Sequence, residues 1–325
     1  MYNPPDRNNW TGRIDVADGD LGTRWHQKTS CINLDSDELP TLKNDYKGIV
    51  LIGFKSDEGV RRNKGRTGAK EGPDALRKAC CNLANHFSEK TIIYDIGDII
   101  CADQDLELAQ DELRKIVAKV QSKDYFPFVF GGGHEVAYPH YMGIVETIDR
   151  DKTIGIINID AHFDLRSQNG LASSGTSFYQ ISKACDSKKK SFNYFCIGIQ
   201  RASNTQVLFN RANDLGVEFL LCHEVNTIAS NQQNTKLQQF IQHMDYIYLT
   251  ICLDVFDIAY APGVSAPTAM GLSPEDALNC IREIVHSGKL ISSDIAELNP
   301  SLDHNGMTAK LAAKLAYEII SEIQA

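Results

Sequence analysis

Long apolar runs are missing from this 325-residue sequence. The longest candidates, such as Tyr246 to Leu253, have the length of a strand and fall far short of the roughly 20 residues that a membrane helix needs. The first residues, Met-Tyr-Asn-Pro-Pro-Asp-Arg, have neither the basic start nor the apolar stretch of a secretory signal. We therefore expect a cytoplasmic protein that does not enter a membrane.

Regularly spaced cysteines and an excess of positive charge are also lacking. The nine cysteines are odd in number and show no Cys-x-x-Cys spacing, so we expect reduced and mostly buried thiols. The net charge is -9, which argues against nucleic acid or an anionic membrane as the main partner. An acidic small substrate stays compatible with this charge, because local residues set the field inside a cleft.

No linker rich in glycine, serine or proline divides the chain, and no repeat is present. Residues 1–45 are polar and without a clear period, and we predict that they form an N-terminal extension packing on a single catalytic domain, residues 46–325. Strands are predicted at 47–54, 91–97, 126–131, 153–160, 193–199, 217–221, 246–254 and 290–295, and helices at 106–120, 236–243, 274–286 and 308–323. This alternation predicts an α/β domain with a mostly parallel sheet of about eight strands. Periodicity leaves open a closed barrel or a three-layer sheet.

In both architectures ligands bind at the carboxyl ends of the strands, and four predicted strand ends carry side chains that can bind metals. These residues are His134 after the third strand, Asp160, His162 and Asp164 after the fourth, Cys252, Asp254 and Asp257 at the end of the seventh, and Glu297 after the eighth. So many carboxylates would repel one another and would be costly to bury unless a divalent cation neutralised them. Mixed carboxylate and imidazole ligands favour manganese, iron or zinc over magnesium or calcium.

The spacing within these segments gives a reason for their convergence. Asp160, His162 and Asp164 alternate, so in an extended backbone all three side chains point to one side. We expect Cys252 and Asp254 to share a face for the same reason. The alternative for the first segment is a capped, hydrogen-bonded turn.

A run of three glycines, Gly131–Gly133, precedes His134. Alone it could be a phosphate cradle or a tight turn. It is not a Walker loop, because no Lys-Ser/Thr pair follows. We expect the glycines to let the chain turn sharply and to place His134 at the end of the sheet.

Taken in order, Gly132-Gly133-His134, Asp160–Asp164, Cys252–Asp257 and Glu297–Pro300 resemble the motifs of the arginase/agmatinase family of manganese ureohydrolases. The resemblance implies the three-layer α/β/α fold of that family and a homo-oligomer. Ser56–Arg66, Ser174–Thr176 and Ala261–Pro267 are typical of its formimidoylglutamase branch. That branch hydrolyses N-formimidoyl-L-glutamate to formamide and L-glutamate, a step of histidine degradation.

The resemblance also implies roles for the residues of the site. Two manganese ions per subunit would be held, one by His134, Asp160, Asp164 and Cys252, and the other by Asp160, His162, Cys252 and Asp254. Together the ions would make hydroxide available near neutral pH for attack on the formimino carbon. Glu297 would pair with the amidinium group of the substrate. Asp257 would support the ligands or give a proton to the leaving amine.

The implied substrate carries two carboxylates, and these need cationic partners. Arg166 stands where arginases have an Asn at the amino-acid end of their substrate, and its fork can bind a carboxylate with two hydrogen bonds. Arg66, from a basic loop that also holds Arg61, Arg62 and Lys64, and Asn204 are further candidates. Each cation of that loop could equally be a solvated surface charge.

One residue departs from the family pattern. The family usually has Asp, bridging both metals, at the position that Cys252 occupies in a gapless match. A gap of two residues would move Asp254 into that role but would break the match further on. A thiolate can bridge metals but is softer than a carboxylate, so it would change the metal preference. We also expect this thiol to react with oxidants when metal is scarce, with Cys31 as one possible disulfide partner.

Two other functions stay open. The first is another amidino- or guanidino-acid hydrolase of the guanidinobutyrase or agmatinase type, although cationic agmatine would be repelled by Arg166. The second is a family member without metals that serves in assembly or regulation, and only Cys252 supports it. Ser174 stands where arginases have a proton-shuttling His, which argues against arginase activity.

Overall fold

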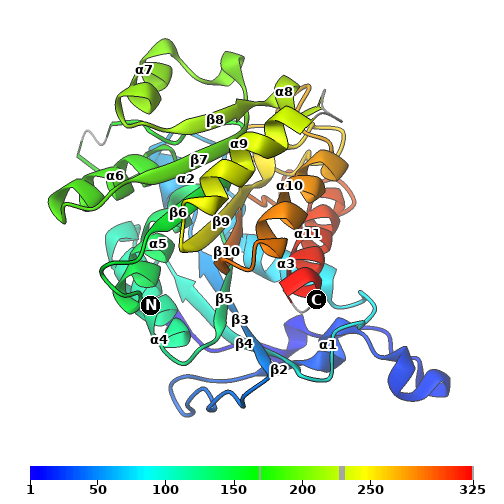
Figure 1. Cartoon of the computed structure of the whole chain (residues 1–325). Helices are drawn as coiled ribbons and strands as arrows, with labels where there is room; N and C mark the ends of the chain where they lie inside the picture. Colours follow the sequence, from blue (N-terminus) through cyan, green and yellow to red (C-terminus); the bar gives the residue numbers. More distant parts are fainter. Residues whose placement is uncertain (168–169, 227–230, 324–325) are drawn as a thin grey trace.

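The computed structural model describes residues 1–167, 170–226 and 231–323 (Figure 1). Ten strands of this part of the chain form one sheet, in the order β1-β4-β3-β5-β10-β9-β6-β7-β8, with β2 also paired to β4. The β1–β4 pair is antiparallel and the other pairs are parallel. The strands are β1 (Tyr2–Asn3), β2 (Thr29–Cys31), β3 (Lys47–Lys55), β4 (Thr91–Ile100), β5 (Phe126–Phe130), β6 (Ile154–Ile159), β7 (Asn193–Ile199), β8 (Glu218–Leu221), β9 (Tyr246–Cys252) and β10 (Leu290–Ala296). All eight strands predicted from the sequence are present, so the predicted sheet is confirmed.

Helices cover both faces of the sheet, which makes the fold a three-layer α/β/α sandwich rather than a barrel (Figure 1). One face carries α4 (Leu106–Gln121), α5 (Ala137–Thr147), α6 (Ser177–Ser187) and α7 (Gln206–Asp214). The other carries α3 (Gly72–Cys80), α9 (Asn231–Gln242), α10 (Pro274–His286) and α11 (Met307–Ile323). Short helices are α1 (Trp25–Lys28), α2 (Glu58–Arg62) and α8 (Cys222–Asn226). None of the described helices is long and apolar enough to cross a membrane.

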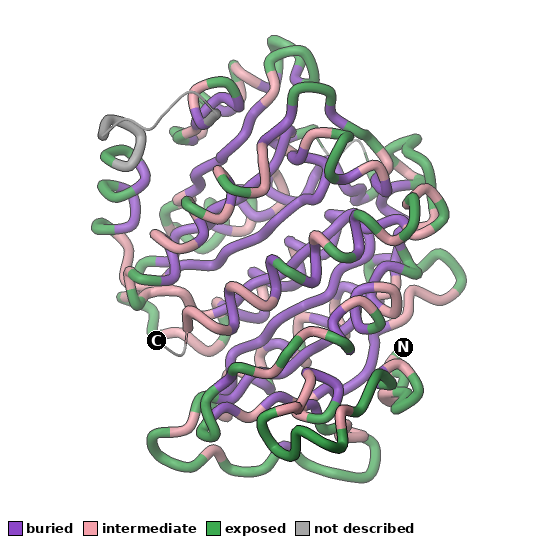
Figure 2. The backbone as a smooth tube through the Cα atoms, turned by 90° about the vertical axis from the view of Figure 1, so that its right-hand side faces the viewer, coloured by how far each residue is buried: buried purple, intermediate pink, exposed green. Residues whose placement is uncertain are grey.

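The sheet is buried on both faces, which explains why its strands read as continuous apolar runs. In β3, Ile49 and Leu51 join the core under α3 and α11, while Val50, Ile52 and Phe54 join the core under α4 and α5. The side chains of a strand alternate between faces, so both cores draw on the same strand. Figure 2 shows the buried strands crossing the middle of the molecule.

The N-terminal segment lies along the β4 side of the sheet. Trp10 and Trp25 are 1% and 0% exposed, with ring centroids 6.2 Å apart. The indole nitrogen of Trp10 donates a hydrogen bond of 2.6 Å to Asp95 of β4. Strands β1 and β2 also come from this segment, and the sequence analysis missed them because two or three residues are too few to show a period.

The central strands determine where the functional site lies. Four neighbours in the sheet, β5, β10, β9 and β6, are the four whose carboxyl ends carry the predicted ligand residues. Parallel strands end at the same edge of the sheet, so the segments that follow them meet there. His134 and Glu297, for example, are joined by a hydrogen bond although 163 positions separate them in the sequence. The fold therefore gathers the four motifs at one edge.

Candidate metal centre

A cavity of about 330 Å³ opens at the carboxyl ends of the central strands. Its wall includes nine of the predicted site residues: His134, His162, Asp164, Cys252, Asp254, Glu297, Arg66, Arg166 and Asn204. Asp160 is fully buried and contacts both His134 and His162. The structure thus brings ten predicted residues together and leaves Asp257 outside the cavity wall.

The donor atoms at the base of this cavity form two groups that share Asp160. In one group, the donor atoms of His134, Asp160 and Cys252 all lie within 4.8 Å of one another. In the other, those of Asp160, His162 and Asp254 do the same. Asp164 lies next to the first group, with its Oδ2 2.9 Å from Nδ1 of His134. A carboxylate shared between two groups of donors is an arrangement that suits a pair of metal ions.

The polar atoms of this cluster also suit bound cations. Within the described part of the chain, Oδ1 of Asp254 is buried and has no hydrogen-bond partner. Buried polar atoms nearly always have one, so an atom left without a partner here suggests that something else binds it. Carboxylate, imidazole and thiol donors together suit manganese, iron or zinc.

The electrostatics of the cluster lead to the same conclusion. Burial raises the pKa of Asp164 and the pKa of Asp254. Burial alone would lower the pKa of His134, but hydrogen bonding and charge from Asp160 and Asp164 raise it well above its usual value. Protons thus stabilise the cluster where cations are absent. Divalent cations would take the place of these protons, because metal ligands must be deprotonated.

The segment that carries three of the ligands is a turn and not an extended strand. Strand β6 ends at Ile159, and Asp160 Oδ1 then accepts a hydrogen bond of 2.7 Å from the backbone N–H of His162. Asp164 has a φ of 47°, in the left-handed region that non-glycine residues seldom adopt. The expected reason for their convergence, alternation along a strand, is therefore wrong. The alternative of a hydrogen-bonded turn describes the backbone, and this turn still directs the ligands into the cavity.

Asn204 fixes that turn with its amide group. Its Oδ1 accepts a hydrogen bond of 3.1 Å from the N–H of Phe163, and its Nδ2 donates to the carbonyl oxygens of Ala161 and Gln200, both at 2.8 Å. All of these partners are backbone atoms. Asn204 thus positions the turn of the ligands, and its amide is not free for the predicted contact with substrate.

The glycine run places His134 where β5, β10 and the loop after β3 approach one another. A Cβ at Gly132 would lie 1.9 Å from the carbonyl oxygen of Ser56, and one at Gly133 would lie 2.0 Å from Oε2 of Glu135. Glycine is therefore needed at these positions because neighbouring atoms come so close to the backbone, whereas the sequence suggested that a sharp turn was the reason.

Glu135 was not singled out from the sequence. It accepts hydrogen bonds of 2.9 Å from the Ser56 hydroxyl and the Gly59 N–H, and burial raises its pKa to about 7.

Glu297 directly follows β10 and lies beside His134 in the cavity wall. Its Oε1 accepts a hydrogen bond of 2.9 Å from the N–H of His134, and burial raises the pKa of its carboxyl well above the usual value. Its φ of 71° is strained for a residue with a Cβ, and such strain of about 1–3 kcal/mol is found mostly at functional sites. Glu297 is thus held at the cavity wall, despite this strain, by surrounding contacts that include its hydrogen bond from His134.

A series of buried hydrogen bonds lies beneath His134, and the sequence did not indicate it. Nε2 of His134 lies 3.0 Å from the hydroxyl of Thr250, which donates a hydrogen bond of 2.6 Å to Asp294. Asp294 also contacts Nδ1 of His140 at 2.6 Å and accepts a hydrogen bond from the Tyr248 hydroxyl. Because Thr250 gives its proton to Asp294, it accepts one from Nε2 of His134, so Nδ1 faces the ligand groups and is the nitrogen that would bind a cation.

The surroundings of Cys252 do not favour the reaction with oxidants that was expected of it. Its side chain is 2% exposed, and burial followed by the charges of Asp160 and Asp254 raises the pKa of its thiol well above the usual value. Burial and these charges thus disfavour the reactive thiolate. Cys31 lies on β2 beside β4, and β3, β5 and β10 separate β4 from the strand of Cys252. The two cysteines are therefore too far apart for the suggested disulfide.

Asp257 stabilises a loop away from the cavity. Its Oδ1 accepts a hydrogen bond of 2.9 Å from the N–H of Ala259, and its Oδ2 accepts one of 3.2 Å from the N–H of Gly271. Both carboxylate oxygens are thus occupied by backbone groups. This arrangement does not favour the predicted role as a proton donor to the leaving amine.

The outer wall of the cavity is basic. Arg166 and Lys64 line it, and neither forms an ion pair with any residue that the structure describes. Arg66 donates through Nε and Nη2 to the carbonyl oxygens of Ser265 and Val264, each at 2.9 Å. The cavity therefore combines a metal-binding base with a wall suited to an anion.

Comparison with known proteins gives a consistent result. The model of the arginase family matches residues 47–321. The chain is 42% identical to the formimidoylglutamase of Clostridium tetani, covering 99% of this chain and 96% of the relative, and 44% identical to that of Chromobacterium violaceum, covering 95% and 96%.

Solved structures resemble the fold over most of its length. The formiminoglutamase of Trypanosoma cruzi with Mn2+2 has a TM-score of 0.76 at 26% identity, covering 86% of this chain and 94% of that one. The formimidoylglutamase of Bacillus subtilis has a TM-score of 0.81 at 22% identity, covering 96% and 94%, which shows a shared fold.

Proposed function

Since this chain belongs to the arginase family and is a hydrolase of its formimidoylglutamase type, we propose that it cleaves N-formimidoyl-L-glutamate to L-glutamate and formamide. One observation carries this proposal beyond the family. A single cavity joins two groups of metal donors to an arginine, Arg166, that has no ion pair among the described residues. This combination suits a substrate with an amidine at one end and carboxylates at the other.

The proposed metal centre holds two manganese ions per subunit. His134, Asp160, Asp164 and Cys252 would bind one, and Asp160, His162, Cys252 and Asp254 the other. The T. cruzi relative with Mn2+2 and the buried Oδ1 of Asp254, which has no hydrogen-bond partner, support this assignment. The ions would supply hydroxide near neutral pH by lowering the pKa of a bound water.

The side chains around the ions would bind and orient the substrate. Glu297 lies at the cavity wall beside His134, where its carboxylate would accept hydrogen bonds from the planar N–H groups of the amidinium. Arg166 would bind a carboxylate at the outer wall. Lys64 and Arg66 add positive charge to the same wall, which disfavours cationic agmatine.

A substrate panel tests this function. With added manganese, we expect formamide from N-formimidoyl-L-glutamate and far slower turnover of agmatine, arginine and 4-guanidinobutyrate. The variants His134→Ala and Asp160→Ala should lose bound manganese and activity together. His286→Ala is a matched control, because this histidine is exposed and pairs with Glu322 at the surface.

Two results would contradict the proposal. Faster hydrolysis of agmatine or of the guanidino acid would reject the substrate. Full activity and metal content in His134→Ala would reject the metal centre.

A further inference from the structure

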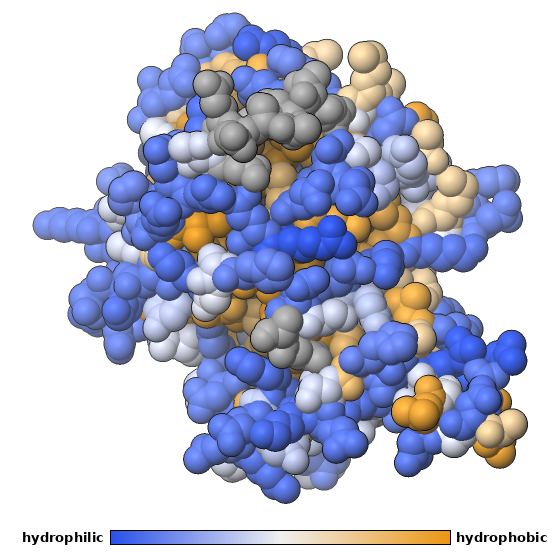
Figure 3. Space-filling model, turned by 45° about the vertical axis from the view of Figure 1, so that its right-hand side comes forward, coloured by the Kyte–Doolittle hydropathy of each residue, from blue (hydrophilic) through white to orange (hydrophobic). Residues whose placement is uncertain are grey.

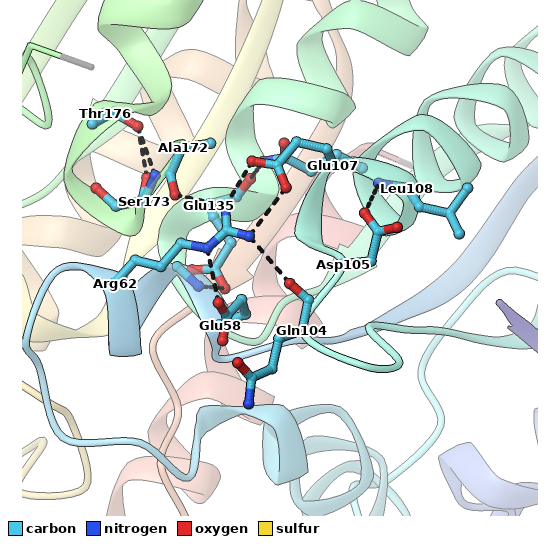
Figure 4. Close-up of polar contacts among 12 residues, drawn as sticks. Glu58, Arg62, Gln104, Asp105, Glu107, Leu108, Glu135, Ala172, Ser173 and Thr176 are labelled. Carbon is cyan, nitrogen blue, oxygen red and sulfur yellow. Dashed lines mark hydrogen bonds and ion pairs between the residues drawn. The ribbon is translucent and has the colours of Figure 1, made fainter. Parts of the chain in front are cut away.

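Arg62, the last residue of α2, connects its own helix to residues 104–107 and to Ala172 through one guanidinium group (Figure 4). Its Nε donates to Glu58 at 2.8 Å, and its Nη2 donates to the carbonyl oxygen of Gln104 at 3.1 Å. Its Nη1 donates to the carboxylate of Glu107 at 2.6 Å and to the carbonyl oxygen of Ala172 at 3.2 Å. Only 10% of the Arg62 side chain is exposed, and its bonds to Glu58 and Ala172 are partly buried.

The segment that Arg62 reaches at Ala172 supports the proposed carboxylate-binding residue. Three positions further on, the carbonyl oxygen of Gly175 accepts a hydrogen bond of 2.9 Å from the backbone N–H of Arg166. The side chain of Arg166 lies directly against Gly175, because a Cβ there would be 2.9 Å from Arg166 Cδ. The backbone and the side chain of Arg166 thus both contact the segment to which Arg62 is hydrogen-bonded at Ala172.

The residue after Arg62 strengthens this connection. Asn63 donates a hydrogen bond of 3.2 Å from Nδ2 to the hydroxyl of Ser174, and both residues line the cavity. The end of α2 is therefore bound to the segment 172–175 at two points. If one of them is lost, the position of the segment and of Arg166 becomes less well defined.

Arg61 provides a natural comparison. It forms the same kind of ion pair with Glu58, with Nε–Oε2 at 2.6 Å. Its side chain, however, is 52% exposed, and Glu58 is its only ion-pair partner among the described residues. Arg61 therefore neutralises Glu58 without contacting the cavity wall. The two arginines differ chiefly because only Arg62 also forms hydrogen bonds with Gln104, Glu107 and Ala172.

We propose that Arg62 is a positioning residue for substrate recognition, which acts by holding the segment 172–175 and thereby the guanidinium of Arg166. The inference rests on the proposed function, in which Arg166 binds a substrate carboxylate. Arg62 itself touches neither the substrate nor the metals. Its loss should therefore weaken binding of the substrate and leave the chemical step intact.

Steady-state kinetics of the manganese-loaded enzyme with N-formimidoyl-L-glutamate test the inference. We expect Arg62→Ala to raise KM about tenfold, with kcat changed by less than about twofold, because only a binding interaction is disturbed. Arg62→Lys should raise KM as well, since a lysine cannot reproduce the forked contacts. Arg61→Ala should leave both constants unchanged. Equal effects of Arg61→Ala and Arg62→Ala would overturn the inference, and so would an unchanged KM in both Arg62 variants.

A double-mutant cycle distinguishes this inference from the proposed function. Arg166→Ala alone should raise KM by about 10–100-fold, and Arg62→Ala should add little in that background, since coupled residues give non-additive effects. If Arg62→Ala multiplies KM by the same factor with and without Arg166, it acts through another group and the inference fails. If Arg166→Ala leaves KM unchanged, the proposed role of Arg166 fails instead. Thermal unfolding of each variant verifies that it is folded, and Arg62→Lys replaces Arg62→Ala in the cycle if the alanine variant does not fold.

Discussion

At the scale of single residues, Cys252 is the only thiol among the candidate metal ligands of the described residues. Its sulfur lies within 4.8 Å of donor atoms of His134 and Asp160, so the thiol occupies a place suited to a metal ligand. Sulfur is a softer ligand than carboxylate oxygen and binds zinc more readily relative to manganese. The thiol should therefore influence which metal the centre selects.

Replacing this residue tests that influence directly. We expect Cys252→Asp to keep two metals and to bind more manganese relative to zinc than the native protein does. Cys252→Ala should bind less of both metals, because a donor is removed. The measurement is the metal content after dialysis against equimolar manganese and zinc. An identical ratio in the native protein and Cys252→Asp would show that the sulfur is not a ligand.

At the scale of secondary structure elements, the centre depends on contacts between neighbouring strands and α5. Thr250 of β9 and Asp294 of β10 are register partners in the sheet, and His140 of α5 reaches Asp294 from the covering layer. All three are 0% exposed. This chain of hydrogen bonds fixes the orientation of His134. Hydrogen-bond partners of a metal-bound histidine commonly affect its affinity for the metal.

Asp294→Asn should therefore weaken manganese binding by about 10–100-fold, because the amide no longer accepts as strongly from Thr250 and His140. Tyr248→Phe is the control, since it removes one hydrogen bond to Asp294 but leaves the bridge through Thr250 intact. Calorimetric titration of the metal-free proteins gives the affinities, and circular dichroism verifies the fold. Native affinity in a folded Asp294→Asn protein would contradict this role.

At the scale of the whole molecule, the N-terminal segment and the sheet form one packed unit. Arg77 of α3 is 1% exposed and bonds both Asp95 and Asp98 of β4, while Trp10 bonds the same Asp95. Exposed apolar side chains of this segment, such as Val16 at 84% and Leu21 at 98%, lie outside that contact. The face drawn in Figure 3 is mainly hydrophilic, with apolar surface confined to small patches.

We expect Trp10→Phe to lower the free energy of unfolding by about 2–4 kcal/mol, from the lost hydrogen bond to a buried charge and the cavity left by the smaller ring. The turnover number should stay unchanged, because Trp10 lies on the β4 side and does not line the cavity. Leu21→Ser, at an exposed position, should change stability by less than about 0.5 kcal/mol. Urea unfolding measures both variants, and equal stabilities would refute a structural role for Trp10.

The sequence by itself determined the eight main strands and which residues are candidate metal ligands. Apolar runs such as Phe126–Phe130 are local features, and burial on both faces of a sheet is the condition that produces them. Ligand residues such as Asp160 and His162 are also recognisable locally, because carboxylates and imidazoles gathered at strand ends are costly without a cation. For these reasons the parallel sheet and a cluster of ligand-type residues could be predicted without coordinates, whereas the choice of three layers over a barrel came only from the family resemblance.

Only the tertiary structure decided how these parts meet. The order β5-β10-β9-β6 depends on pairing between strands that are distant in the chain, and no local pattern encodes it. The turn of Asp160–Asp164 depends on Asn204, and the orientation of His134 depends on Asp294 and His140. Hydrogen bonds of this kind join residues far apart in sequence, so their partners become known only when the folded chain brings them together.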